Sequence, residues 1–355
     1  MIGGHWDISW HRSIGRDTFW TPAHIAIYLC GVLAGISCGY LILASTAGRV
    51  PELRGATVRI WGFEGPLGAF IAAWGGIAML TSAPFDDWWH NAYGLDVKIL
   101  SPPHVVLITG ILAVELGALI LVLGRMNRAV GAERTRLERL FLYLAAMLLV
   151  VCMILAIEYV SRTYLHTARA YRVAATFAPL VLTGVARASG RRWAATTVAG
   201  LYTAFLLGFI WVLPLFPAEP KLGPVYRSVT HFVPPDFPLL FIAPALALDL
   251  LRRRAAGWKP WAYATAGGTL FLGVFMAVEW PFASLLMSTA ARNRFFGTPF
   301  LDYSLPPWSY TARYLFYPAP GGAAFWEEMA LALVLAVAGT RLGLAWGSWM
   351  RSIRR

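Results

Sequence analysis

Long apolar runs recur along the whole chain and limit its fold more than any other feature of the sequence. A run of about 20 apolar residues is long enough to cross a membrane as a helix. Only 14% of the 355 residues are charged, whereas soluble domains carry about 25%. The sequence therefore predicts an all-α fold, a polytopic bundle of about nine membrane-spanning helices, of which the fifth and seventh are short enough to be re-entrant. The nine runs cover residues 22–45, 64–83, 103–123, 140–160, 172–187, 194–214, 238–251, 262–285 and 325–345.

The 30 Lys and Arg residues are spread unevenly over the segments that connect these runs. Rich and poor segments alternate, and 19 of the 30 basic residues fall in 46–62, 124–139, 187–192, 252–259 and 341–355. Because basic residues stay on the cytoplasmic side, the alternation predicts an outside N-terminus and an inside C-terminus in a bacterial-type inner membrane. The net charge of +12 is then a topology signal. It indicates the lipid bilayer as a partner and no nucleic acid.

Two segments on the predicted outer side share one pattern, with Asp, Trp, His, Gly, Asp, Pro and His in the same order. One residue is inserted before the proline of the second copy. Seven specific matches are hard to obtain by chance, so we interpret the segments as an internal repeat. The spans that follow both run inwards, which predicts a parallel repeat about an axis along the membrane normal. Its acidic and histidine positions are Asp7, His11, Asp17 and His24, and Asp86, His90, Asp96 and His104.

Each copy is expected to form a short interfacial helix, a turn and the start of a membrane helix. Asp and His four residues apart lie on one face of a helical turn, and a glycine soon afterwards commonly ends a helix. Thr21 and Ser101 are good N-caps, and Pro22 and Pro102 suit the first helical position. The second histidine of each copy then lies in the first turn of a span, where it can meet the preceding Asp and His.

One carboxylate and two imidazoles per copy form a donor set that suits zinc, copper, iron or nickel. Three protein ligands leave one position open for water, oxygen or a substrate. The same residues could instead cap helices and bind water, but repetition at nearly equal spacing favours metal. The sequence predicts two metal sites, one with Asp7, His11 and His24 and one with Asp86, His90 and His104.

The spacing resembles that of the C subunit of copper membrane monooxygenases, the particulate methane and ammonia monooxygenase group. That family has an Asp-x3-His-x12-His site, which the first copy matches residue by residue. A neighbouring Asn-x3-His-x13-His site matches the second copy in spacing, with Asp86 in place of Asn. The resemblance implies copper as the cofactor, oxygen-dependent oxidation of a small apolar substrate, and other membrane subunits as partners.

The resemblance covers residues 1–123 and divides the chain into this metal-binding repeat region and a membrane helical region of unknown role, 124–355. The Asp in the second copy makes that site more anionic, and zinc or non-haem iron remain alternatives to copper. Copper or zinc capture or transport on the outer face, without redox catalysis, is the alternative function. A structural subunit braced by metal is a third, and a homo-oligomer is the alternative to partner subunits.

Further polar residues lie near the predicted outer ends of the spans. Asp17 and Asp96 could orient a histidine by a hydrogen bond to its other ring nitrogen, or Asp17 could pair with Arg12 or Arg16. Four more residues are candidates for extra ligands, proton relays or ion pairs, because ionisable groups inside a membrane are functional candidates. These are Glu158, Glu279, His166 and His231.

Overall fold

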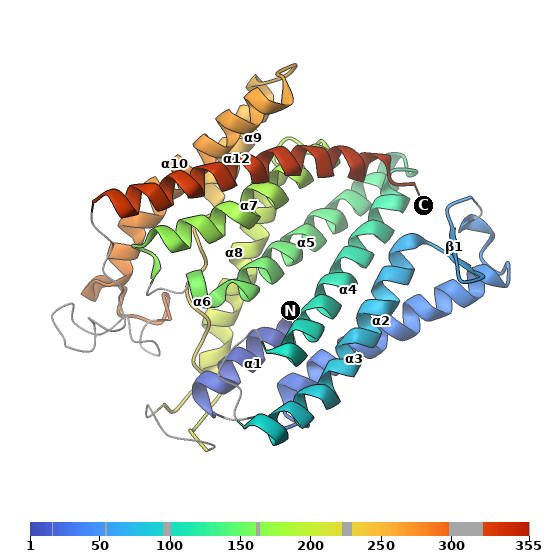
Figure 1. Cartoon of the computed structure of the whole chain (residues 1–355), viewed down its shortest axis with the longest axis horizontal. Helices are drawn as coiled ribbons and strands as arrows, with labels where there is room; N and C mark the ends of the chain where they lie inside the picture. The colour runs from blue at the N-terminus through green and yellow to red at the C-terminus, as the bar shows by residue number, and fades with distance from the viewer. Residues whose placement is uncertain are drawn as a thin grey trace. The chain divides into compact units, whose positions relative to one another are not determined.

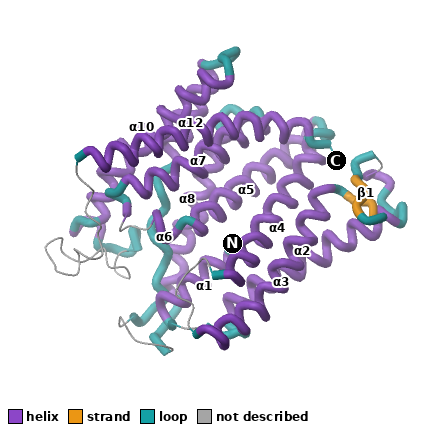
Figure 2. The backbone as a smooth tube through the Cα atoms, viewed as in Figure 1, coloured by secondary structure: helices purple, strands orange, loops and turns teal. Residues whose placement is uncertain are grey.

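The protein is almost entirely helical, as Figure 2 shows for a computed structural model of the chain. The structure describes residues 1–15, 17–53, 55–94, 101–160, 164–221, 229–297 and 322–354. The α-helices are α1 (Ile2–Ser13), α2 (Pro22–Thr46), α3 (Leu67–Tyr93), α4 (Pro102–Met126), α5 (Gly131–Leu155), α6 (Ile157–Val160), α7 (Ala168–Ser189), α8 (Ala194–Val212), α9 (Ile242–Arg254), α10 (Pro260–Leu286) and α12 (Ala323–Ser352). The strands β1 (Val58–Ile60) and β2 (Phe63–Gly65) form one antiparallel hairpin, and the short 3-10 helices are η1 (Pro51–Leu53), η3 (Leu213–Leu215) and η4 (Thr289–Ala291). The all-α prediction is confirmed.

Seven helices of the described residues are long and apolar enough to cross a membrane, as expected of a multi-pass membrane protein: α2, α3, α4, α5, α8 with η3, α10 and α12. The other two predicted spans, 172–187 and 238–251, correspond to α7 and α9, which do not meet this criterion. The 13 residues of α9 are fewer than the roughly 20 that a crossing needs. The count of nine spans and their orientation stay predictions.

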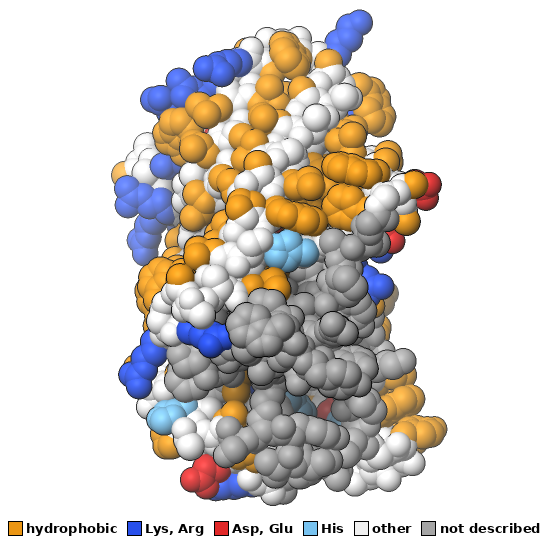
Figure 3. Space-filling model, turned by 90° about the vertical axis from the view of Figure 1, so that its left-hand side faces the viewer, with side chains coloured by type: hydrophobic (Ala, Val, Ile, Leu, Met, Phe, Trp, Pro, Cys, Tyr) orange, Lys and Arg blue, Asp and Glu red, His pale blue; other side chains and the backbone are white. Residues whose placement is uncertain are grey.

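Large apolar side chains are exposed on the candidate spans. On α2, Leu33 is 63% exposed and Ile36 is 67% exposed. Figure 3 shows one face of the molecule, on which hydrophobic side chains cover much of the described helical surface. Monomers that fold in water rarely expose such apolar areas, so these side chains suit contact with lipid.

The chain folds as two compact units. Unit 1 comprises Met1–His11, Arg16–Val151 and Met350–Arg355, and unit 2 comprises Arg12–Gly15 and Cys152–Trp349. Both copies of the repeat belong to unit 1, apart from the short segment at the end of α1. Most of α5 also packs in unit 1, so this unit extends beyond residue 123, where the sequence was divided.

In unit 1, α3 packs against both α2 and α4, as Figure 1 shows. Gly75 of α3 and Gly110 of α4 meet backbone to backbone, because a Cβ on Gly75 would lie 2.7 Å from the carbonyl oxygen of Gly110. Small residues allow membrane helices this close approach. Since successive helices run in opposite directions, the start of α2, the end of α3 and the start of α4 lie at one end of the bundle.

The N-terminal helix α1 packs on the first turns of α2. A Cβ on Gly3 would lie 2.7 Å from a side-chain carbon of Ile27 and 3.0 Å from the carbonyl oxygen of Ala23. The absence of a side chain at Gly3 therefore lets α1 lie directly against α2. This contact brings the acidic and histidine positions of α1 close to His24.

In unit 2, two buried carboxylates accept hydrogen bonds from backbone N–H groups that have no partner within a helix. Asp249 of α9 is fully buried and accepts hydrogen bonds from the backbone N–H and the hydroxyl of Thr196 at the start of α8, at 2.9 and 2.8 Å. Glu279 of α10 is 2% exposed and accepts a bond of 2.9 Å from the N–H of Leu240, in the extended chain before α9. Non-helical backbone is tolerated at membrane depth where protein groups satisfy it. This pairing explains why the predicted span 238–251 is only partly helical.

Candidate metal centre

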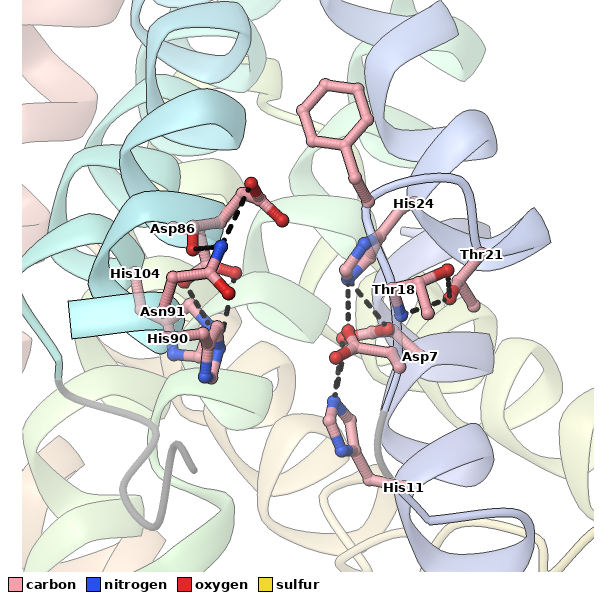
Figure 4. A network of polar contacts seen from close by, with 12 residues as sticks. Asp7, His11, Thr18, Thr21, His24, Asp86, His90, Asn91 and His104 are labelled. Atoms are coloured by element: carbon pink, nitrogen blue, oxygen red, sulfur yellow. Dashed lines mark hydrogen bonds and ion pairs between the residues drawn. The ribbon is translucent and has the colours of Figure 1, made fainter. Parts of the chain in front are cut away.

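The first copy of the repeat brings Asp7, His11 and His24 together from α1 and α2. The Nε2 atom of His24 lies 3.3 Å from Oδ1 of Asp7, and Nε2 of His11 lies 3.9 Å from Oδ2 of the same carboxylate. Figure 4 shows the two imidazoles approaching the Asp7 carboxylate from opposite sides. The Oδ1 atom of Asp7 is buried and accepts no hydrogen bond in the described structure. We call this group site 1.

The second copy brings Asp86, His90 and His104 together from α3 and α4. The Nε2 atoms of His90 and His104 each lie 3.5 Å from an oxygen of Asp86. The other ring nitrogen of His90 lies 3.3 Å from the carbonyl oxygen of Gly94, a partner that typically orients a metal-binding imidazole. We call this group site 2.

Most imidazole–carboxylate distances in the two predicted triads are closer to ligand spacings around a metal ion than to ordinary hydrogen bonds. Ligands 2.0–2.1 Å from a tetrahedral ion lie about 3.3–3.4 Å apart. Three of the four imidazole–carboxylate distances in the predicted triads are 3.3 to 3.5 Å, longer than the 2.7–2.9 Å of a charge-assisted hydrogen bond. Each imidazole presents Nε2, and each triad contains an aspartate oxygen that is buried and has no hydrogen bond from any described residue. The donor types suit a small divalent ion or copper, and among the described residues the ligand atoms of Asp7, His11 and Asp17 all lie within 4.8 Å of one another.

The two sites are neighbours within unit 1. The charges of Asp17 and His24 act on the Asp86 carboxyl group, and Figure 4 shows the two groups of side chains facing each other. Tyr28, one turn beyond His24 on α2, lies within the fields of both sites, since Asp86, Asp17 and Asp7 all act on it. Its hydroxyl donates a hydrogen bond of 3.1 Å to the carbonyl oxygen of Phe19.

The local structure of the first copy follows the prediction. Helix α1 ends at Ser13, and α2 begins at Pro22 with Thr21 at the N-cap. The Thr21 hydroxyl accepts a bond of 2.8 Å from the N–H of Thr18, so it closes the preceding turn instead of capping α2 with its side chain.

The prediction of a separate interfacial helix in the second copy is wrong. Asp86 and His90 lie in the last turns of α3, which continues past Pro84 to Tyr93. A proline inside a membrane helix is tolerated when neighbouring groups satisfy the freed backbone. Gly94 ends this helix with φ of 89°, as predicted, and Ser101 and Pro102 begin α4.

Asp17 lies inside site 1, beside the histidine nitrogens that face Asp7. Its Oδ2 atom lies 2.6 Å from Nε2 of His24 and 3.4 Å from Nε2 of His11. The predicted hydrogen bond to the other ring nitrogen is therefore wrong for Asp17, and Nδ1 of His24 is buried without a partner in the described structure. The alternative partner Arg12 instead pairs with Asp236 at 3.3 Å. Arg16 and Asp96 lie outside the described residues.

The acids and bases of site 1 alter one another's protonation. Burial alone would lower the pKa of His11, but the hydrogen bond to Asp17 and the charges of Asp7 and Asp17 raise it above 6.5. Burial alone would raise the pKa of Asp17, but hydrogen bonds with His11 and His24 hold it well below 3.8. Without metal, site 1 thus binds protons at the histidine nitrogens that would otherwise coordinate an ion.

The other candidate residues belong to unit 2. His166 shares a 3.0 Å hydrogen bond with Ser284, and burial lowers its pKa. His231 shares one of 2.9 Å with Thr230, and Glu279 binds the backbone of Leu240 as described above. The side chain of Glu158 lies outside the described residues.

Comparisons with known protein families, curated proteins and solved structures find no match for this chain.

Proposed function

We propose that this protein is a membrane metal-binding subunit that holds copper at sites 1 and 2 and takes part in oxygen-dependent oxidation of a small apolar substrate. The observation that carries the proposal is the convergence of both predicted triads at one end of the α2–α3–α4 bundle, with donor spacings of 3.3 to 3.9 Å. The resemblance to the C subunit of copper membrane monooxygenases supplies the choice of copper. The outer side of an inner membrane is the proposed location of both sites.

The chain's own residues supply the binding and orientation that this function needs. The carboxylates of Asp7 and Asp86 offset the charge of a bound cation, which is costly to hold near lipid without a counter-charge. The Gly94 carbonyl oxygen lies 3.3 Å from Nδ1 of His90, which leaves Nε2 of that ring to hold an ion. Bound copper would supply the oxygen chemistry.

An apolar groove on α2, the helix that carries His24, supports an apolar substrate. The groove has a volume of about 540 Å³ and runs along α2 from Ala26 to Cys38, with Val114, Ala118 and Leu121 of α4 opposite. Ala26 is two residues from His24. Volumes of about 300–1,000 Å³ are usual for small-molecule sites. A small apolar molecule dissolved in the bilayer could enter this groove.

The proposal is tested by oxygen consumption of the copper-loaded protein, purified with any co-purifying subunits and supplied with short-chain hydrocarbons. His11→Ala and His104→Ala should each lower bound copper and turnover together, and Asp87→Asn should change neither. Asp87 is a suitable control because its carboxylate binds Asn91 one turn away. Full activity of protein stripped of metal would contradict the proposal.

Capture of copper or zinc without redox catalysis is the second candidate, favoured by the exposure of site 1. The His11 side chain is 43% exposed, so an ion could enter from solvent. This function predicts saturable metal binding without oxygen consumption. Transport is a weaker version, because beyond the sites α2 and α4 carry few groups that commonly bind metal, namely Tyr28, Cys30, Cys38, Tyr40 and Glu115. Metal flux in proteoliposomes would distinguish transport from capture.

A further inference from the structure

The Asp17 carboxylate approaches the same two nitrogens as Asp7. Its Oδ2 atom lies 2.6 Å from Nε2 of His24 and 3.4 Å from Nε2 of His11. Ligand atoms of Asp7, His11 and Asp17 all lie within 4.8 Å of one another. A carboxylate that only orients a metal-binding histidine bonds to the ring nitrogen away from the metal. Asp17 is on the metal side of both rings, and its 2.6 Å contact with His24 is a hydrogen bond that a bound ion would replace.

The fold holds Asp17 in this position. Its side chain is only 8% exposed, and the turn that follows is closed by two hydrogen bonds between Thr18 and Thr21, at 2.8 and 3.0 Å. This turn leads directly into α2, which carries His24. A carboxylate so enclosed is expected to have a cationic partner, because burying an unpaired charge is costly.

We propose that Asp17 is the fourth ligand of site 1, which thereby becomes a closed site with two carboxylates and two imidazoles that selects a divalent ion. The inference deepens the proposed function and rests on it. Two carboxylates and two neutral imidazoles carry a charge of −2, which a divalent ion neutralises and a monovalent ion does not. Near a low-dielectric bilayer, this difference favours Zn²⁺ or Cu²⁺ over Cu⁺.

Four protein ligands are typical of zinc sites that stabilise structure, whereas three with an open position are typical of reactive sites. Site 1 therefore holds its ion without an open position, and substrate or oxygen does not bind that ion directly.

The test uses the full chain with site 2 removed by His90→Ala and His104→Ala, so that Zn²⁺ and Co²⁺ report on site 1 alone. In this background, Asp17→Asn should weaken Zn²⁺ binding by at least about 10- to 100-fold in a chelator competition, the range found when outer partners of a metal site are removed. The absorption bands of four-coordinate Co²⁺ should be lost. Asp17→Glu should retain the Co²⁺ absorption bands and most of the Zn²⁺ affinity. Asp87→Asn should match the background protein.

Binding of Cu⁺ under reducing conditions gives the second readout. Asp17→Asn should change Cu⁺ affinity far less than Zn²⁺ affinity, because the removed charge matters most for the divalent ion. Equal Zn²⁺ affinity and an unchanged Co²⁺ spectrum in Asp17→Asn would overturn the role of Asp17 and leave the metal site itself intact. If neither Zn²⁺ nor Co²⁺ binds to the background protein, site 1 itself is overturned. Circular dichroism of each variant shows whether a loss of metal binding is caused by misfolding. If Asp17→Asn misfolds, Asp17→Glu decides the result: retained Zn²⁺ affinity and Co²⁺ bands support Asp17 as a ligand, and their loss in a folded protein contradicts it.

Discussion

Gly75 of α3 lies against Gly110 of α4 so closely that a Cβ on either residue would meet the other's carbonyl oxygen at less than 3.0 Å. This contact lies between the helices that carry Asp86 and His104, so we expect it to help position site 2. Gly75→Leu should destabilise the protein by at least about 1–3 kcal/mol, the usual cost of overpacking, and should reduce metal binding at site 2. Thermal unfolding in detergent and metal content are the measurements.

Gly39→Leu on α2 is the matched control for this prediction. A Cβ at Gly39 has no neighbour within 4 Å, so the substitution should be tolerated and should leave metal content unchanged. Equal effects of the two leucines would mean that the α3–α4 contact does not position site 2.

The stability of the metal-free protein should depend on pH through His11 and Asp17. The raised pKa of His11 contributes stability that is complete below pH 6.5 and is lost as the pH rises through the raised value. The lowered pKa of Asp17 contributes stability that is present above pH 3.8 and is lost as the pH falls through the lowered value. Asp17→Asn should therefore lower the melting temperature most between pH 3.8 and 6.5.

Bound metal should reverse the pH dependence that His11 gives to stability, because an ion must displace the proton from His11. Affinity for Zn²⁺ at site 1 should rise as the pH increases through the raised pKa of His11. Melting curves of wild type and Asp17→Asn, with chelator and with Zn²⁺, test both statements. A constant difference between the two chelated proteins across the pH range would contradict the ion pairs of site 1.

The apolar groove between α2 and α4 should bind small apolar molecules. Ala118→Phe fills the groove from α4 and should abolish labelling of its walls by a photoreactive alkyl probe, measured by mass spectrometry. Metal content should not change. Leu140→Phe, at an exposed position of α5 outside the groove, is the control. Labelling that survives in Ala118→Phe, or that excess lipid alone removes, would argue against a substrate path.

Asp249→Ala should destabilise unit 2 by about 1–3 kcal/mol, the cost of leaving buried hydrogen-bonding groups unsatisfied. The carboxylate accepts bonds from the N–H and the hydroxyl of Thr196. Thr197→Ala is the control, since Thr197 is exposed and its hydroxyl, among the described residues, donates a hydrogen bond to the carbonyl oxygen of Trp193 at the start of the same helix. Denaturant unfolding should separate the two variants, and an equal effect would mean that Asp249 does not cap α8. Neither variant should alter metal content.

Patterns within a few residues predicted much of this structure. The Asp-x3-His spacing, the glycine that follows and the Pro at the start of a span describe α1, the turn and α2 in the first copy. Such features depend on helix periodicity and on proline's missing N–H, which act locally. Local patterns also separated the apolar helices from their connections.

Features that depend on distant contacts were missed. The role of Asp17 requires a turn folded against two helices, and no local pattern fixes where its carboxylate lies. The break before α9 depends on Glu279, 39 residues away from Leu240. Helix α3 continues past Pro84 because neighbouring groups can satisfy the backbone that the proline frees. A proline in the sequence normally signals a helix end, so this continuity was not predicted.

Metal content of the purified, copper-loaded protein tests the central claim most directly. Sites 1 and 2 predict two copper ions per chain in wild type, one in His24→Ala, one in His104→Ala and none in the double variant, since each histidine serves one site. Copper bound at wild-type levels by the double variant would contradict the assignment of both sites.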